Sequence, residues 1–163
     1  MKGKKTDLSQ VECGIARALG VIGDWWSLLI VRDAMRGMTR FGEFQTNLGL
    51  ARNILSTRLK KLVEDGILDI TPDPEGSVYK IYVLTPRGRA LGTVLVALWQ
   101  WGETYCFDDD ELSLTLVDRA SGTPIAPIAL TTVDGQPVAP DGYMSAPRPK
   151  RRATRKATQR APA

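Results

Sequence analysis

Residues 51–68 place the strongest constraint on how this chain can fold. At 100° per residue, Ala51, Leu55, Leu59 and Leu62 share one face, while polar side chains lie opposite. A glycine ends this periodicity, and a β-branched run follows it at once. The segment therefore predicts an amphipathic helix with one buried face, a stop, and then a strand.

The elements on either side of this helix predict the fold class. Residues 41–48 have helical spacing, with Thr39 as the expected N-cap. A two-residue turn connects them to the amphipathic helix over 51–64. Strand-like runs at 67–71 and 78–84 flank a turn rich in Pro and Gly, and a Thr-Pro pair opens a helix over 86–106. Two helices followed by a hairpin make a winged helix-turn-helix, so we expect a mainly α fold with a small β-hairpin wing.

Composition divides the rest of the chain. Helices are expected over 11–22 and 25–36, the second capped by Asp24, and after an acidic stretch we expect a strand at 112–116 and a hairpin pairing 125–133 with 136–138. The predicted organisation is a polar basic arm (1–10), a winged-helix DNA-binding and dimerisation domain (11–107), a short C-terminal β appendage (108–144) and a disordered basic tail (145–163).

The net charge of +4 is unevenly distributed. Residues 148–163 hold seven cations and no acid, so residues 1–147 hold 15 cations against 18 acids, a net of −3. The folded part is therefore not uniformly basic, and any DNA contact must come from specifically placed cations. The tail is expected either to tether the protein to DNA without sequence preference or to be a solvated terminus.

Several function classes are disfavoured by composition. The chain has no His, so the usual general base is absent, and its two Cys cannot form a disulfide framework. Two thiols without His also argue against a zinc site. There is no paired-carboxylate, phosphate-loop or dinucleotide signature, and no run of 18 apolar residues. We therefore expect no enzyme activity, no cofactor, no metal and no membrane partner, and a cytoplasmic, nucleoid-associated protein.

Polar residues on the outward face of the 51–64 helix are the candidate DNA-binding residues. Amide, hydroxyl and cationic side chains there can reach base edges and phosphates in a major groove. Arg40 is a candidate phosphate contact, Lys80 is the cation nearest the wing, and Arg58 is expected to form an ion pair within the protein. The full candidate set is Arg40, Arg52, Asn53, Ser56, Thr57, Lys60 and Lys80.

The apolar arc of the last long helix covers about 160°, which is wider than one core contact needs. We expect one edge of this arc to pack on its own domain and the other to meet a second subunit. The candidate dimer-interface residues are Leu91, Leu95, Leu98, Trp101 and Tyr105.

With these elements in order, the chain resembles the HxlR family of bacterial winged-helix transcriptional regulators, which are relatives of the MarR group. The resemblance spans roughly residues 11–106. It rests on Cys13, Ala16-Arg17-Ala18-Leu19, Val21-Ile22-Gly23, Trp26-Ser27-Leu28-Leu29-Ile30, Arg32, Arg40-Phe41, Glu43-Phe44, Leu55-Ser56, Arg58-Leu59, Leu62, Gly66-Ile67-Leu68, Tyr82-Val83-Leu84-Thr85, Gly88, Leu91 and Trp101-Gly102.

The resemblance implies a homodimer, joined through its first and last helices, that binds inverted repeats in double-stranded DNA. The alternative is a regulator that responds to an oxidant or a small molecule, since some family members sense electrophiles through the cysteine that matches Cys13. Trp25, Trp26, Trp99 and Trp101 are either effector-pocket residues or core and interface residues. The acidic turn of the wing departs from the family pattern and does not favour binding in a minor groove, because that groove has a negative potential.

Overall fold

The computed structural model describes residues 8, 10–76, 78–108 and 111–147. Contacts divide the chain into two compact units, Met1–Ala126 and Pro127–Ala163. The first unit contains, in chain order, α1 (Gly14–Ile22), α2 (Trp25–Met35), α3 (Phe41–Leu48), α4 (Arg52–Glu64), β1 (Leu68–Pro72), β2 (Lys80–Leu84), α5 (Pro86–Arg89) and α6 (Gly92–Tyr105).

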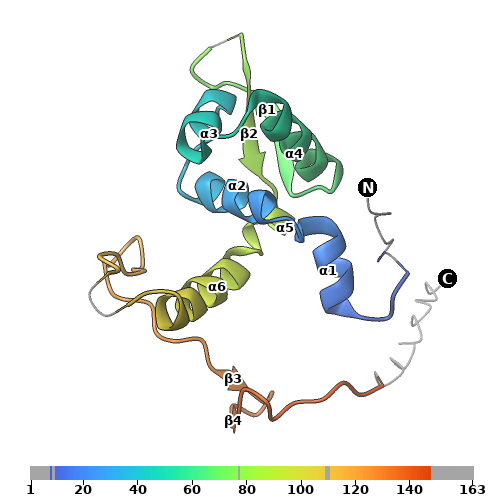
Figure 1. The fold of residues 1–163 in the computed structure, drawn as a ribbon, viewed down its shortest axis with the longest axis vertical. Helices are drawn as coiled ribbons and strands as arrows, with labels where there is room; N and C mark the ends of the chain where they lie inside the picture. Colours follow the sequence, from blue (N-terminus) through green and yellow to red (C-terminus); the bar gives the residue numbers. More distant parts are fainter. Residues whose placement is uncertain (1–7, 9, 77, 109–110, 148–163) are drawn as a thin grey trace, which may run out of the picture. The chain divides into compact units, whose positions relative to one another are not determined.

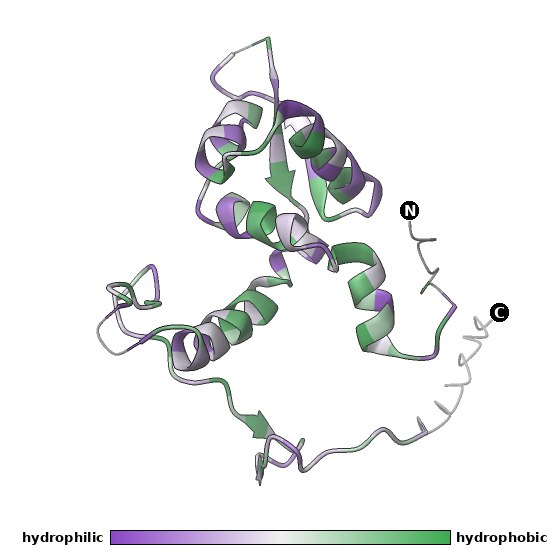
Figure 2. Ribbon diagram, in the orientation of Figure 1, coloured by the Kyte–Doolittle hydropathy of each residue, from purple (hydrophilic) through white to green (hydrophobic). Residues whose placement is uncertain are grey.

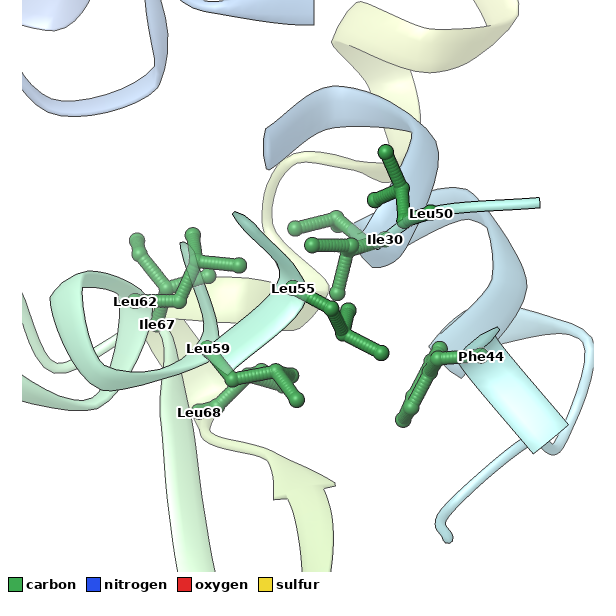
Figure 3. Close-up of a cluster of buried hydrophobic side chains, with 9 residues drawn as sticks. Ile30, Phe44, Leu50, Leu55, Leu59, Leu62, Ile67 and Leu68 are labelled. Carbon is green, nitrogen blue, oxygen red and sulfur yellow. The ribbon is translucent and has the colours of Figure 1, made fainter. Parts of the chain in front are cut away.

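The core of the first unit forms where α4 packs on α2, α3 and the strands. Leu55, Leu59 and Leu62 of α4 are fully buried, as their spacing predicts. Figure 3 shows Leu55 between Ile30 of α2 and Phe44 of α3, and Leu62 beside Ile67. The prediction was wrong for one residue of this face, because Ala51 is the N-cap of α4 and is exposed. The Leu stripe thus fixes which face of α4 is left for solvent.

Asp24 connects α2 to α4. It is the N-cap of α2, as predicted: its carboxylate accepts hydrogen bonds from the Ser27 amide at 3.0 Å and from the Ser27 hydroxyl at 2.6 Å. Its Oδ1 also lies 3.3 Å from Nε of Arg58, which confirms the ion pair expected for Arg58. One carboxylate therefore caps a core helix and holds the recognition helix against it.

A buried carboxylate connects α2 to α3. Asp33 is fully buried and accepts hydrogen bonds from Nδ2 of Asn47 at 2.7 Å and from Nε of Arg32 at 2.8 Å. A buried carboxylate without such partners would be costly, so these contacts fix the position of α3 on α2. Helical periodicity alone cannot identify these partners of Asp33, because Asn47 lies 14 positions away on another helix.

Strands β1 and β2 form the antiparallel wing, in a register that pairs Leu68 with Leu84 and Pro72 with Lys80. Figure 1 shows α3, α4 and this hairpin at one end of the first unit and α6 at the other. The amide of Tyr82 donates to the carbonyl of Thr39 at 2.8 Å, which joins the wing to the residue before α3. The wing and the two helices are thus one packed assembly.

Hydrogen bonds of Thr85 join the end of the wing to the start of α5. The hydroxyl of Thr85 accepts from the Gly88 amide at 3.0 Å, as expected of an N-cap, and donates to the carbonyl of Gly66 at 2.7 Å. The single helix predicted over 86–106 is wrong, because the chain forms the short α5 and then α6. This break lets α5 remain against the wing while α6 packs on α2.

Two further predictions of local structure are wrong. Thr39 does not cap α3; the N-cap is Arg40, and the carboxylate of Glu43 accepts from the amides of Thr39 and Arg40. Residues 112–116 do not form a strand, since only an isolated bridge between Val117 and Pro124 occurs there in the described chain. Alternation of apolar and polar residues favours a strand but cannot supply a pairing partner for it.

The second unit contains a small antiparallel ladder. Strands β3 (Leu130–Thr131) and β4 (Pro137–Val138) pair through Leu130 and Val138, with Gly135 at φ 80° in the connecting turn. This confirms the predicted hairpin, although it is shorter than expected. The predicted limits of the arm, domain, appendage and tail stay predictions.

No single described helix has the length and hydropathy needed to cross a membrane, and α1 with α2 reach them together only across a bend of 77°.

Candidate nucleic-acid interface

The turn between α3 and α4 sets the angle between the two helices. Gly49 ends α3 in the left-handed conformation, at φ 62°, and its amide donates to the carbonyl of Gln45 at 3.0 Å. A side chain is disfavoured at that φ, which explains a glycine here. Leu50 then enters the core and α4 begins two residues later. This is the geometry of a helix-turn-helix.

The outward face of α4 carries the predicted DNA-binding residues. Arg52, Asn53, Ser56, Thr57 and Lys60 are all exposed. At 100° per residue, Asn53, Thr57 and Lys60 lie opposite the buried Leu stripe, whereas Arg52 lies about 60° from Leu55, at the N-terminal end of the helix. The structure therefore brings these five side chains together on one solvent-facing surface. Figure 2 shows the corresponding hydrophilic colouring on α4.

Three of these side chains have contacts within the protein. The guanidinium of Arg52 lies 5.7 Å from the centre of the Phe41 ring, a cation–π contact that joins the start of α4 to α3. The hydroxyl of Thr57 donates to the carbonyl of Asn53 at 2.8 Å. Lys60 lies 3.8 Å from Glu64 in an exposed pair, which is a weak interaction in water. The contact to Phe41 orients Arg52 in a way that helical spacing did not reveal.

Arg40 lies beside the wing. Its guanidinium donates to Asp73 from Nη2 at 2.9 Å and from Nε at 3.2 Å, and it also donates to Glu75. Hydrogen bonds from the Glu75 amide and from Arg40 hold the pKa of the Asp73 carboxyl below its ordinary value. The sequence identified the acidic wing but not this pairing, which offsets part of the wing's negative charge. A phosphate contact by Arg40 stays a prediction and would have to compete with these carboxylates.

The remaining candidate cation, Lys80, is exposed at the first position of β2. It therefore lies in the wing rather than on α4. Its contact with DNA also stays a prediction.

The Glu43 carboxylate stabilises the start of α3. It accepts from the Arg40 amide at 2.8 Å and the Thr39 amide at 2.7 Å, and these two bonds lower the pKa of Glu43 from its ordinary value of 4.5. Because the folded-state pKa is the lower one, this stabilisation is fully present above the ordinary value. It is lost as the pH falls through the lowered pKa.

Glu43→Gln is therefore expected to lower the free energy of unfolding at neutral pH by about 0.5–2 kcal/mol, the usual range for loss of a helix cap. The difference from the wild type should shrink as the pH is lowered below about 4.5, because the wild-type carboxyl then becomes neutral. Urea denaturation at several pH values measures both effects. Glu103→Gln is the control, because Glu103 is an exposed residue of α6. If the difference in free energy of unfolding between Glu43→Gln and the wild type did not shrink below pH 4.5, the role assigned to Glu43 would be contradicted.

A second surface, at the other end of the first unit, is apolar. Leu98, Trp101 and Tyr105 of α6 are 47%, 60% and 71% exposed, and the rings of Trp101 and Tyr105 lie 5.6 Å apart. Leu91 and Leu95, by contrast, pack against the protein's own core. The candidate dimer residues on α6 and at its N-cap, Leu91, thus form two groups, one covered within the chain and one uncovered.

Helix α1 exposes apolar side chains as well. Ile15 is 71% exposed and Leu19 is 53% exposed. Cys13, at the N-cap of α1, and Cys106, at the C-cap of α6, are both free and exposed thiols.

Two sequence-based expectations lie partly or wholly outside the described residues. The seven cations of the basic tail fall in 148–163, and the lysines of the N-terminal arm fall in 1–7. Within the part of the chain that is described, no group of three or more His, Cys, Asp or Glu side chains is arranged to hold a metal ion.

The helix-turn-helix, its exposed polar recognition helix and the hairpin that follows define a winged helix-turn-helix protein. The HxlR-like helix-turn-helix family model matches residues 21–110, and the chain belongs to this family. Membership confirms the resemblance and the predicted fold class. The family and the matched relatives are transcriptional regulators rather than enzymes.

Relatives and solved structures agree with this assignment. The chain is 46% identical over 94 residues to the HTH-type transcriptional regulator Rv3095 of Mycobacterium tuberculosis, a match that covers 56% of this chain and 58% of the relative. A crystal structure of PA1607, described as a transcription factor, is 50% identical, covers 86% of this chain and 99% of that one, and has a TM-score of 0.81. The reduced form of YodB from Bacillus subtilis is 31% identical, with coverages of 59% and 96% and a TM-score of 0.51.

Proposed function

We propose that the protein is a homodimeric, sequence-specific regulator that binds inverted-repeat operators in double-stranded DNA. The observation that carries the proposal is the exposed polar face of α4, the second helix of the helix-turn-helix, whose opposite face is a fully buried Leu stripe. In such motifs the start of the second helix meets base edges in the major groove. Residues Arg52 and Asn53 would be the principal contacts, with Ser56, Thr57 and Lys60 following them.

The dimer proposal is supported by the uncovered apolar side chains of α6 and α1. A two-fold dimer would present two copies of α4, so the operator should contain half-sites about 10 bp, or a multiple of 10 bp, apart. A protein that acts on chromosomal DNA in this way would work in the cytoplasm, at the nucleoid. The basic tail would add contacts without sequence preference, through phosphates.

The experiment begins with selection of preferred DNA from a random pool, followed by binding measurements on the selected operator. Arg52→Ala and Asn53→Ala are each expected to weaken specific binding by about 1–3 kcal/mol while the fold is retained, because each removes a base or phosphate contact. Lys61→Ala is the matched control, since Lys61 lies further round the same helix and pairs with Asp65 at 2.6 Å.

Two results would contradict the proposal. One is unchanged operator affinity in folded Arg52 and Asn53 variants, and the other is failure of the selection to enrich any sequence. A loss of affinity that is equal for operator and unrelated DNA would indicate that these residues contact only phosphates.

The alternative proposal is a thiol-responsive regulator. It is supported by the free and exposed thiol of Cys13 at the start of α1, beside the apolar side chains proposed for the dimer. Alkylation of the protein, followed by a gel shift with the operator, separates this proposal from constitutive binding. Cys13→Ser should abolish the effect of alkylation, and Cys106→Ser should preserve it.

A further inference from the structure

A large cavity lies away from the polar face of α4. It has a volume of about 770 Å³ and is formed between α2, α6 and the segment 116–125. Its walls are mainly apolar and aromatic, and include Trp25, Leu29, Met35, Leu95, Trp99 and Ile125. Cavities of roughly 300–1,000 Å³ with such walls are typical of small-molecule sites.

The segment 116–125, which forms the third wall of the cavity, is a hydrogen-bonded turn. The amide of Ile125 donates to the carbonyl of Leu116 at 2.9 Å, and the Asp118 carboxylate accepts from the amide and hydroxyl of Ser121 at 2.8 and 2.7 Å. Nη2 of Arg119 donates to the carbonyl of Met35 at 3.0 Å. This last bond ties the turn to the C-terminal end of α2, so the wall is held in place.

The charged side chains at the cavity favour an anion. Arg32 is paired with the buried Asp33 at 2.8 Å, and the guanidinium of Arg119 donates to the carbonyl of α2. Asp118, the acid in the lining, is engaged by Ser121. Arg36 lines the cavity at the C-cap of α2, is exposed, and has no side-chain partner within the described part of the chain. The guanidinium of Arg36 is therefore available to bind an anion at the edge of the apolar cavity.

We propose that this cavity binds a small aromatic or apolar monocarboxylate, with its apolar body between Trp25 and Trp99 and its carboxylate on Arg36. Charge complementarity selects the acid over its neutral analogue, because a guanidinium recognises a carboxylate through charge-assisted hydrogen bonds. The size and lining of the cavity select an apolar body.

Helix α2 couples the cavity to the DNA-binding surface, and this part of the inference rests on the proposed function. Helix α2 forms one wall, and the same helix holds α3 through Asp33 and Asn47 and α4 through Asp24 and Arg58. A ligand between α2 and α6 acts directly on the helix that positions the helix-turn-helix. Ligand and operator should therefore change each other's affinity by the same factor.

The test uses naphthalene carboxylate and its neutral amide as probes, with tryptophan fluorescence and calorimetry of the full chain in the absence of DNA. The wild type should bind one carboxylate per chain, more tightly than the amide. Arg36→Gln should weaken binding of the carboxylate by about three- to tenfold and leave the amide unaffected. Arg17→Gln, an arginine of α1 outside the cavity lining, is the matched control. Val96→Trp, which fills the cavity, should weaken both probes.

Equal affinity for the carboxylate and the amide, or equal loss in the Arg36 and Arg17 variants, would overturn the proposal. Binding seen only in a monomeric variant would also overturn it, because a second copy of the chain would then occupy the cavity. Since the probe titration uses no DNA, failure to find an operator would count against the proposed function and leave the binding result intact.

Discussion

Replacing Trp101 with Glu is expected to produce monomers and to lower operator affinity by about 10²–10⁴-fold, the gain that linked binding to two half-sites usually provides. Trp101 is 60% exposed on α6, and its ring lies tilted beside that of Tyr105, so a charge there should not disturb the chain's own core. In a dimer the same carboxylate would be buried without a partner. Sedimentation at micromolar concentration, with a gel shift on the selected operator, measures both effects.

Trp101 is a better position for this test than Leu98, because Leu98 also lines the cavity between α2 and α6. Glu103→Lys is the matched control: it changes the charge of the same helix on the side away from Trp101. A wild type that sediments as a monomer, or a Trp101→Glu variant that remains dimeric, would refute the assignment of this face. Monomers that keep full operator affinity would show that dimerisation is not needed for binding.

Gly88→Ala is expected to destabilise the winged-helix unit by about 1–3 kcal/mol, a large share of the stability of a domain this size. A Cβ at Gly88 would lie 2.2 Å from the carbonyl oxygen of Ile67 and 2.9 Å from Cδ2 of Leu84. The first contact is with backbone, so either α5 or the start of the wing must move. That movement would also disturb the hydrogen bonds of Thr85 to Gly66 and Gly88.

Gly42→Ala is the control for this substitution, because a Cβ at Gly42 meets nothing within 4 Å and alanine favours the helix. Urea denaturation should show a lower midpoint for Gly88→Ala and an equal or slightly higher one for Gly42→Ala. Equal stability of Gly88→Ala and the wild type would mean that α5 is not held against the wing as described.

Local patterns in the sequence were sufficient to predict most of the helices and the wing. The Leu stripe of α4, the Asp24 cap and the Thr85 cap depend on residues within a few positions of one another, and such short-range relations can be read without the fold. The outward polar face of α4 follows from the same periodicity. The wrong predictions were boundaries, such as the cap of α3 and the break between α5 and α6.

Tertiary structure alone decided the contacts between residues distant in sequence. Arg40 and Asp73 are 33 positions apart, Asp33 and Asn47 are 14 apart, and Arg119 and Met35 are 84 apart. No periodicity relates such pairs, because their approach depends on how whole helices pack. The same packing decides that Leu95 lies against the core while Trp101 remains exposed, and it creates the cavity between α2 and α6. Side-chain type and spacing determine which faces must be buried, whereas only the folded chain determines what each face meets.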